Sequence, residues 1–202
     1  IRHAAAAVRA LSPAPQTVTS TVPDEPAAHT VWTIGHSTRS IAELIGTLAA
    51  YDIELVADVR RYPGSRRLPQ FTQPALRSSL EAAGLCYVWI PALGGRRRAL
   101  ADSPNTAWRH EAFRGYADHL QSEEFAGGLF ELLLLAGGLR TAVMCAEVLW
   151  WRCHRRLIAD ALVTLGVDVV HVADATHAQP HVVAPPARVV DGVLRYDLRT
   201  PG

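Results

Sequence analysis

Residues 139–162 constrain the fold of this chain more than any other segment, because they read as a strand, a loop and a helix in succession. Residues 141–145 form a short apolar run with β-branched members, which is typical of a strand buried on both faces of a parallel sheet. After the loop, residues 152–165 carry apolar side chains at helical spacing. This unit predicts a helix that packs back on a parallel sheet.

The same alternation of strand and helix recurs along most of the chain. Strands are expected at 31–34, 53–58, 86–90, 141–145 and 167–172, with helices at 112–121 and 124–136 and after Ser40 and Thr72. Ser40 and Glu43 have the spacing of a capping box, and Thr72 is expected to cap the helix that follows it. The pattern predicts a single α/β domain over residues 31–175, with a mostly parallel central sheet of about five strands flanked by helices.

The two ends of the chain differ from this middle part. Residues 1–30 are rich in Ala, Pro, Thr and Val without regular periodicity, so we expect a disordered leader. The tail at 176–202 is rich in Pro, and its short apolar runs on either side of Asp191 and Gly192 predict a β-hairpin.

The composition narrows the class of protein. The chain has 202 residues, is 49% apolar and has a net charge of +1, which is enough for one full core and gives no global attraction to nucleic acid or membrane. Its 20 basic residues are all Arg, the side chain better suited to bidentate phosphate contacts. The 3 cysteines do not form a disulfide scaffold, and no apolar run is long enough to span a membrane. We therefore expect a cytoplasmic protein without a membrane partner.

Unusual polar residues follow the predicted strands. They are His36, Asp58, Arg60, Arg96 and Cys145. The carboxyl ends of parallel strands lie along one edge of a sheet, where α/β proteins bind ligands. We therefore expect these residues to converge on one site.

The candidates for catalysis at this edge are Cys145, His36, Asp58 and Glu147. Cys145 follows a strand near a helix N-terminus and several Arg, surroundings that favour a thiolate nucleophile. His36 or His154 is then the base, and Asp58 or Glu147 orients it. Glu147 and Asp58 are alternatively a pair of acid and base carboxylates. The structural alternatives are a buried, inert Cys145 and an Asp58 that pairs with neighbouring Arg.

The arginines near the predicted strand ends, with aromatic residues between them, are expected to form a cationic rim. Such a rim is typical of proteins that bind single-stranded nucleic acid or a flipped base. Such a rim also fits a smaller phosphorylated ligand. The alternative is that the Arg are solvated surface residues and the aromatics belong to the core. The predicted phosphate-binding residues are Arg60, Arg96, Arg152, Arg155, His154 and Ser37, and the predicted stacking residues are Trp150, Trp151, Tyr62 and Tyr116.

The sequence predicts neither a metal nor a cofactor. Cys145, Cys153 and His154 have the spacing Cys-x7-Cys-His, which is outside the usual zinc patterns. The chain also lacks both a G-x-G-x-x-G turn and any lysine for a Walker motif. His171, His177 and His181 are widely spaced and are expected at the surface.

Five motifs resemble those of the family known as domain of unknown function 488. They are TIGHS at 33–37, DVRRYPGS at 58–65, ALGGRRR at 92–98, FRGYADHL at 113–120 and MCAEVLWWRCHRRLIADAL at 144–162. The resemblance covers about residues 31–175 and supports the α/β fold. It implies no settled activity, although some members are similar to companions of DNA-repair domains and others carry an iron–sulfur assembly label.

Together these observations favour an enzyme that acts on a phosphate-bearing substrate, nucleic acid or nucleotide, at the C-terminal edge of the sheet. A hydrolase or a glycosylase-type enzyme fits best. The alternatives are a non-catalytic nucleic-acid-binding module and a cysteine-based thiol or sulfur-transfer protein.

Overall fold

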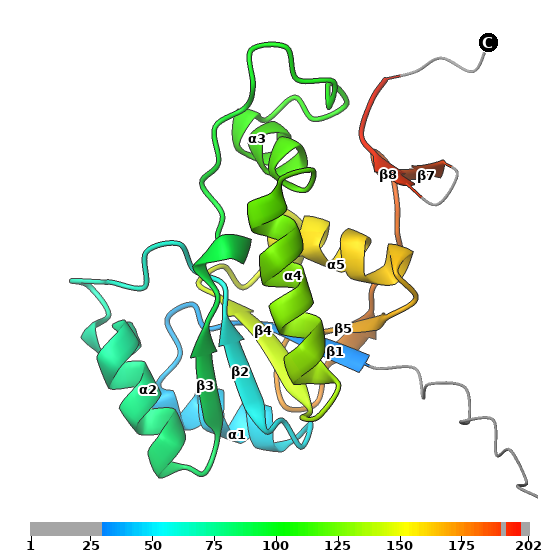
Figure 1. The fold of residues 1–202 in the computed structure, drawn as a ribbon. Coiled ribbons are helices and arrows are strands. Elements are labelled where there is room, and N and C mark those ends of the chain that lie inside the picture. Colours follow the sequence, from blue (N-terminus) through cyan, green and yellow to red (C-terminus); the bar gives the residue numbers. More distant parts are fainter. Residues whose placement is uncertain (1–29, 191–192, 199–202) are drawn as a thin grey trace, which may run out of the picture.

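The computed structural model describes residues 30–190 and 193–198 and is built around one six-stranded sheet (Figure 1). The strand order is β3-β2-β4-β1-β5-β6, in which the first five strands are parallel and β6 is antiparallel to β5. The strands are β1 (Thr30–Gly35), β2 (Leu55–Asp58), β3 (Cys86–Trp89), β4 (Thr141–Cys145), β5 (Asp168–Val172) and β6 (Ala178–Pro180). The predicted α/β class with a mostly parallel sheet is confirmed.

Helices cover both faces of this sheet (Figure 1). They are α1 (Ile41–Ala49), α2 (Gln73–Ala82), α3 (Glu111–His119), α4 (Glu123–Ala136) and α5 (Arg155–Thr164). Side chains alternate along a strand, so Met144 packs in the core beneath α1 and α2, while Val143 and Cys145 pack in the core beneath α4 and α5. The residue that ends β4 therefore faces α5.

The loops after β1 and β4 begin side by side. The chain leaves β1 toward β2 and leaves β4 toward β5, on opposite sides of this adjacent pair, which makes their carboxyl ends a topological switch point. Backbone pairing continues past the strand ends, since His36 N donates to Cys145 O at 2.9 Å and Ser37 N donates to Ala146 O at 2.9 Å. These loops, with those after β2 and β3, form the candidate site.

Local expectations are met at one helix start and corrected at two others. The capping box of Ser40 and Glu43 is present. The Thr72 hydroxyl donates to Pro69 O at 2.8 Å and does not cap α2. Helix α5 begins at Arg155 and not at Arg152, because residues Trp150–Arg152 form a 3-10 turn and Cys153 is extended.

The C-terminal segment packs against the domain. The predicted hairpin is formed by β7 (Arg188–Val190) and β8 (Val193–Arg195), and its turn lies outside the described residues, as does the expected leader except for Thr30. Tyr196 is buried and donates to Asp160 on α5 at 2.8 Å. In the part of the chain that the structure describes, no helix has the length and apolarity needed to cross a membrane.

Candidate functional site

A cavity of about 610 Å³ opens at the carboxyl ends of β2 and β4. Its lining arginines are Arg60, Arg61, Arg96 and Arg152, and its carboxylate is Glu147. Tyr62 and Trp151 provide aromatic walls, and they are 65% and 47% exposed. Cys145, Cys153 and His154 also line it. The predicted convergence at the sheet edge is thus observed for Cys145, Glu147, Arg60, Arg96, Arg152 and His154.

The two buried cysteines and a histidine form a compact cluster in this cavity. The Sγ atoms of Cys145 and Cys153 and a ring nitrogen of His154 all lie within 4.8 Å of one another. Cys153 Sγ is 3.5 Å from His154 Nδ1, and His154 Nε2 donates to the Val59 carbonyl at 3.2 Å. This second contact uses Nε2 and leaves Nδ1 facing Cys153.

The electrostatics of the cluster favour one thiolate. A hydrogen bond from the Cys145 thiol, together with His154 and Arg155, holds the pKa of Cys153 well below its usual range. The pKa of Cys145 is raised by its hydrogen bond to Cys153 and by its burial. The negative charge is thus placed on Cys153, and the nucleophile assigned to Cys145 from the sequence fits Cys153 better.

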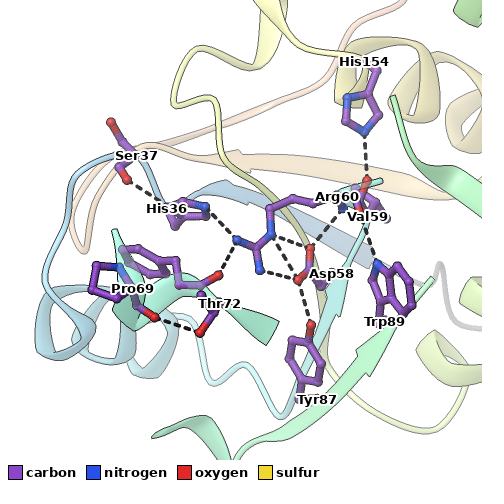
Figure 2. A network of polar contacts seen from close by, with 11 residues as sticks. His36, Ser37, Asp58, Val59, Arg60, Pro69, Thr72, Tyr87, Trp89 and His154 are labelled. Atoms are coloured by element: carbon purple, nitrogen blue, oxygen red, sulfur yellow. Dashed lines mark hydrogen bonds and ion pairs between the residues drawn. The ribbon is translucent and has the colours of Figure 1, made fainter. Parts of the chain in front are cut away.

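His36, Asp58 and Arg60 form an internal network next to the cavity (Figure 2). Arg60 Nε donates to Asp58 at 2.9 Å and its Nη2 donates at 2.6 Å, while Tyr87 Oη donates to the same carboxylate at 2.8 Å. Arg60 Nη1 also donates to the Phe71 carbonyl at 2.8 Å. Asp58 is fully buried, so its carboxylate supports Arg60 and does not reach a ligand in the cavity.

His36 is held as a neutral ring. Its Nδ1 donates to Ser37 O at 2.9 Å, its Nε2 accepts from Arg60 at 3.2 Å, and its ring stacks on Phe71. Burial and the adjacent Arg60 cation lower its pKa to about 4. Both ring nitrogens of His36 are therefore occupied, which corrects the expectation that His36 is a free base. Ser37, a predicted phosphate-binding residue, contributes its backbone carbonyl to this contact.

Three other predicted site residues are occupied inside the protein. Arg155 is 1% exposed and donates to the Glu147 and Val148 carbonyls and to Thr33 Oγ1, and so does not present its charge to a ligand. Trp150 stacks on His171, with 3.9 Å between the ring centroids. Tyr116 is buried, and its hydroxyl donates to Leu93 O. The predicted stacking face is therefore reduced to Tyr62 and Trp151.

A buried polar chain runs from Arg155 to the C-terminal segment. Thr33 Oγ1 lies 2.7 Å from His171 Nδ1, His171 Nε2 lies 2.9 Å from His181 Nδ1, and His181 Nε2 donates to Asp160 at 2.8 Å. The expectation that His171 and His181 lie at the surface is wrong, because these contacts satisfy their ring nitrogens inside the core.

The buried histidines should make the protein acid-sensitive. Burial and the neighbouring His181 and Arg155 lower the pKa of His171 to about 3. Unfolded His has a pKa of about 6.5, so between these pH values only the unfolded chain takes up the proton, and stability falls as pH decreases below about 6.5. Each such histidine adds a slope of up to about 1.4 kcal/mol per pH unit.

Urea denaturation at several pH values tests this expectation. The parent should lose stability between pH 6.5 and 4.5, and His171→Gln should be less stable at pH 7.5 but show a shallower pH dependence, by about one proton. Equal slopes for the two proteins would contradict the assignment of a neutral, buried His171.

Sequence reasoning missed several members of the site. Cys153 was considered only as a metal ligand with unsuitable spacing, and His110, which lines the cavity, was not a candidate. The adjacency of Cys153 and His154 was the one available signal.

A family model for the domain of unknown function DUF488 matches residues 40–162, more than half of the chain. The chain belongs to this family. The DUF488 match includes Arg61, Arg96, Glu147, Cys153 and the rest of the cavity lining, whereas the TIGHS motif of β1 lies outside it. No curated protein and no solved structure matches the chain.

Proposed function

We propose that this DUF488 protein is an enzyme that binds a phosphate-bearing substrate, a nucleotide or one nucleotide of a nucleic acid, in the 610 Å³ cavity. The observation that carries the proposal is the joint lining by Arg61, Arg96 and Arg152 with Glu147 and the Cys145–Cys153–His154 cluster. A volume of this size falls within the range of about 300–1,000 Å³ typical of small-molecule sites.

Three of the lining arginines, Arg61, Arg96 and Arg152, are suited to hold the phosphate. No acidic side chain among residues 30–190 and 193–198 forms an ion pair with them, whereas Arg60 and Arg97 are paired with Asp58 and Glu124. Guanidinium groups bind phosphate oxygens in bidentate fashion. Arg96 has a left-handed backbone, with φ of 57°, a conformation that costs a non-glycine residue about 1 kcal/mol and often marks functional positions.

The remaining lining supplies recognition and chemistry. Tyr62 and Trp151 offer exposed faces on which a base can stack. Glu147 is an exposed carboxylate, whose Oε1 accepts from Leu149 N at 3.1 Å, and is the group best placed for general acid or base work on a substrate held by the arginines.

The competing function of a binding module is less well supported. Such a protein needs a continuous row of free cations and aromatic faces along a strand. Arg60, Arg155, Trp150 and Tyr116 are all used in internal contacts, so the remaining predicted arginines and aromatic residues gather around one cavity. The thiol or sulfur-transfer alternative depends on the same cavity through Cys153.

Titration of the protein with a fluorescent nucleoside monophosphate and a short labelled single strand tests the proposal. Arg152→Ala should weaken binding by about 10-fold, since a hydrogen bond to a charged group contributes about 1.5–3 kcal/mol. For the oligonucleotide, the salt slope should also fall by about 0.7, the loss of one phosphate contact. Arg67→Ala removes an exposed arginine outside the cavity and serves as the matched control.

Two outcomes would contradict this function. One is binding that is absent at low salt, and the other is an equal loss for Arg152→Ala and Arg67→Ala. Glu147→Gln then separates catalysis from binding. With a panel of nucleotides analysed by chromatography, the parent should convert at least one of them, and the variant should bind that nucleotide but not convert it.

A further inference from the structure

The cluster of Cys145, Cys153 and His154 has the chemistry of a metal site. We propose that these three residues bind one divalent transition-metal ion, with Zn²⁺ as the first choice, and leave a fourth coordination position open to the cavity. Among the residues that the structure describes, this is the one group of three His, Cys, Asp or Glu side chains whose ligand atoms lie close enough to share an ion.

The donor separations suit tetrahedral coordination. Zinc bonds of about 2.3 Å to sulfur and 2.0–2.1 Å to nitrogen place neighbouring donors about 3.5–3.8 Å apart. Cys153 Sγ and His154 Nδ1 are 3.5 Å apart, and all three donors lie within 4.8 Å. Two sulfurs and one imidazole form a set that catalytic zinc uses, in which water or substrate occupies the fourth position.

Neighbouring groups orient the histidine as they do in metal proteins. The bond from His154 Nε2 to the Val59 carbonyl fixes the tautomer in which Nδ1 carries the lone pair, the usual support for a metal-bound imidazole. Gly95 provides the space for the ring, because a Cβ at position 95 would lie 2.7 Å from Nδ1. An alanine at 95 would displace the ligand.

The charge around the cluster is also compatible with thiolate ligands. Arg155 is 1% exposed, no ion pair joins it to an acidic residue in the described ranges, and its Nε is buried without a hydrogen-bond partner. A buried cation of this kind needs a nearby negative charge, which the two sulfurs can supply. With a divalent ion bound, the two thiolates, the ion and Arg155 sum to one positive charge, which an anionic oxygen at the open position can neutralise.

The spacing of the cysteines concealed this arrangement in the sequence. Cys145 ends β4 and Cys153 precedes α5, and the 3-10 turn at Trp150–Arg152 between them folds the loop back so that the sulfurs meet. The role of the ion rests on the proposed function, since its open position would take water or a phosphate oxygen beside Glu147 and Arg152. The existence of the site does not depend on that function.

Metal titration of the reduced, chelator-treated full chain tests the inference. We expect one equivalent of Zn²⁺ to bind and to protect two of the three thiols from a thiol reagent, leaving Cys86, which is exposed, reactive. Co²⁺ in place of Zn²⁺ should give sulfur-to-cobalt charge-transfer absorption. Cys145→Ser and Cys153→Ser should each weaken Zn²⁺ binding at least 100-fold, and Cys86→Ser, the matched control, should not change it.

Thiol protection by Zn²⁺ is measured in the parent protein, so this test does not depend on whether the cysteine variants fold. The inference is overturned if Zn²⁺ leaves the reaction rates of all three thiols unchanged, or if Cys86→Ser removes binding. Binding of the phosphate ligand is measured separately, in the chelator-treated parent and in Arg152→Ala. If Zn²⁺ does not protect the thiols but the parent still binds the phosphate ligand, the metal site alone is refuted. If Zn²⁺ protects the thiols but the phosphate ligand does not bind, the proposed substrate alone is refuted.

Discussion

Asp58→Ala is expected to lower the free energy of unfolding by about 3–5 kcal/mol, because it leaves the buried Arg60 cation without its counter-ion. Asp58 is fully buried, Arg60 is 7% exposed, and two guanidinium nitrogens of Arg60 as well as the Tyr87 hydroxyl donate to the lost carboxylate. Urea denaturation at pH 7.5 measures the effect. Tyr87→Phe, which removes a single donor, should cost only about 1 kcal/mol.

This result separates a structural from a catalytic role for Asp58. If Asp58 has a structural role, the double variant Asp58→Ala with Arg60→Leu should lose less stability than the sum of the two single variants. The reason is that the double variant no longer contains an uncompensated buried charge. A loss of nucleotide conversion with less than about 0.5 kcal/mol of destabilisation, the usual range of surface substitutions, would instead place Asp58 in the chemistry.

Gly35→Ala should destabilise the protein by at least about 3 kcal/mol, since it forces backbone against backbone. A Cβ at position 35 would lie 2.0 Å from the Glu147 carbonyl oxygen and 2.7 Å from Val148 Cα. The loop after β4 would have to move, which would take the Glu147 and Val148 carbonyls away from Arg155 and shift Glu147 in the cavity. Thermal unfolding together with nucleotide binding measures both consequences.

Gly46→Ala provides a matched control for this substitution. Gly46 lies within α1, and a Cβ there would meet no atom within 4 Å. Replacing a helical glycine by alanine stabilises by about 0.5–1 kcal/mol. If the two alanine variants unfold at the same temperature, the close approach of the loops after β1 and β4 is not a constraint on the fold.

Periodicity predicted most of the sheet and the edge at which the cavity lies, because buried parallel strands have continuous apolar runs and polar residues follow their ends. It could not predict which cations are paired inside the protein. Arg60 and Arg61 are adjacent and both line the cavity, yet Arg60 is paired with Asp58, whereas Arg61 has no acidic partner in the described ranges. The zinc spacing rules did not identify Cys153 for a related reason. The 3-10 turn between Cys145 and Cys153 sets the distance between their sulfurs, and that turn cannot be read from the spacing.

The position of β1 has a consequence for how the protein can be divided. β1 lies between β4 and β5 and pairs with both, yet it precedes the segment matched by the DUF488 model, and β5 follows it. A fragment cut to residues 40–162 would leave β4 with an open edge in the middle of the molecule and would remove Tyr196 and His181 from Asp160. The stretch shared across the family is thus smaller than the unit that folds.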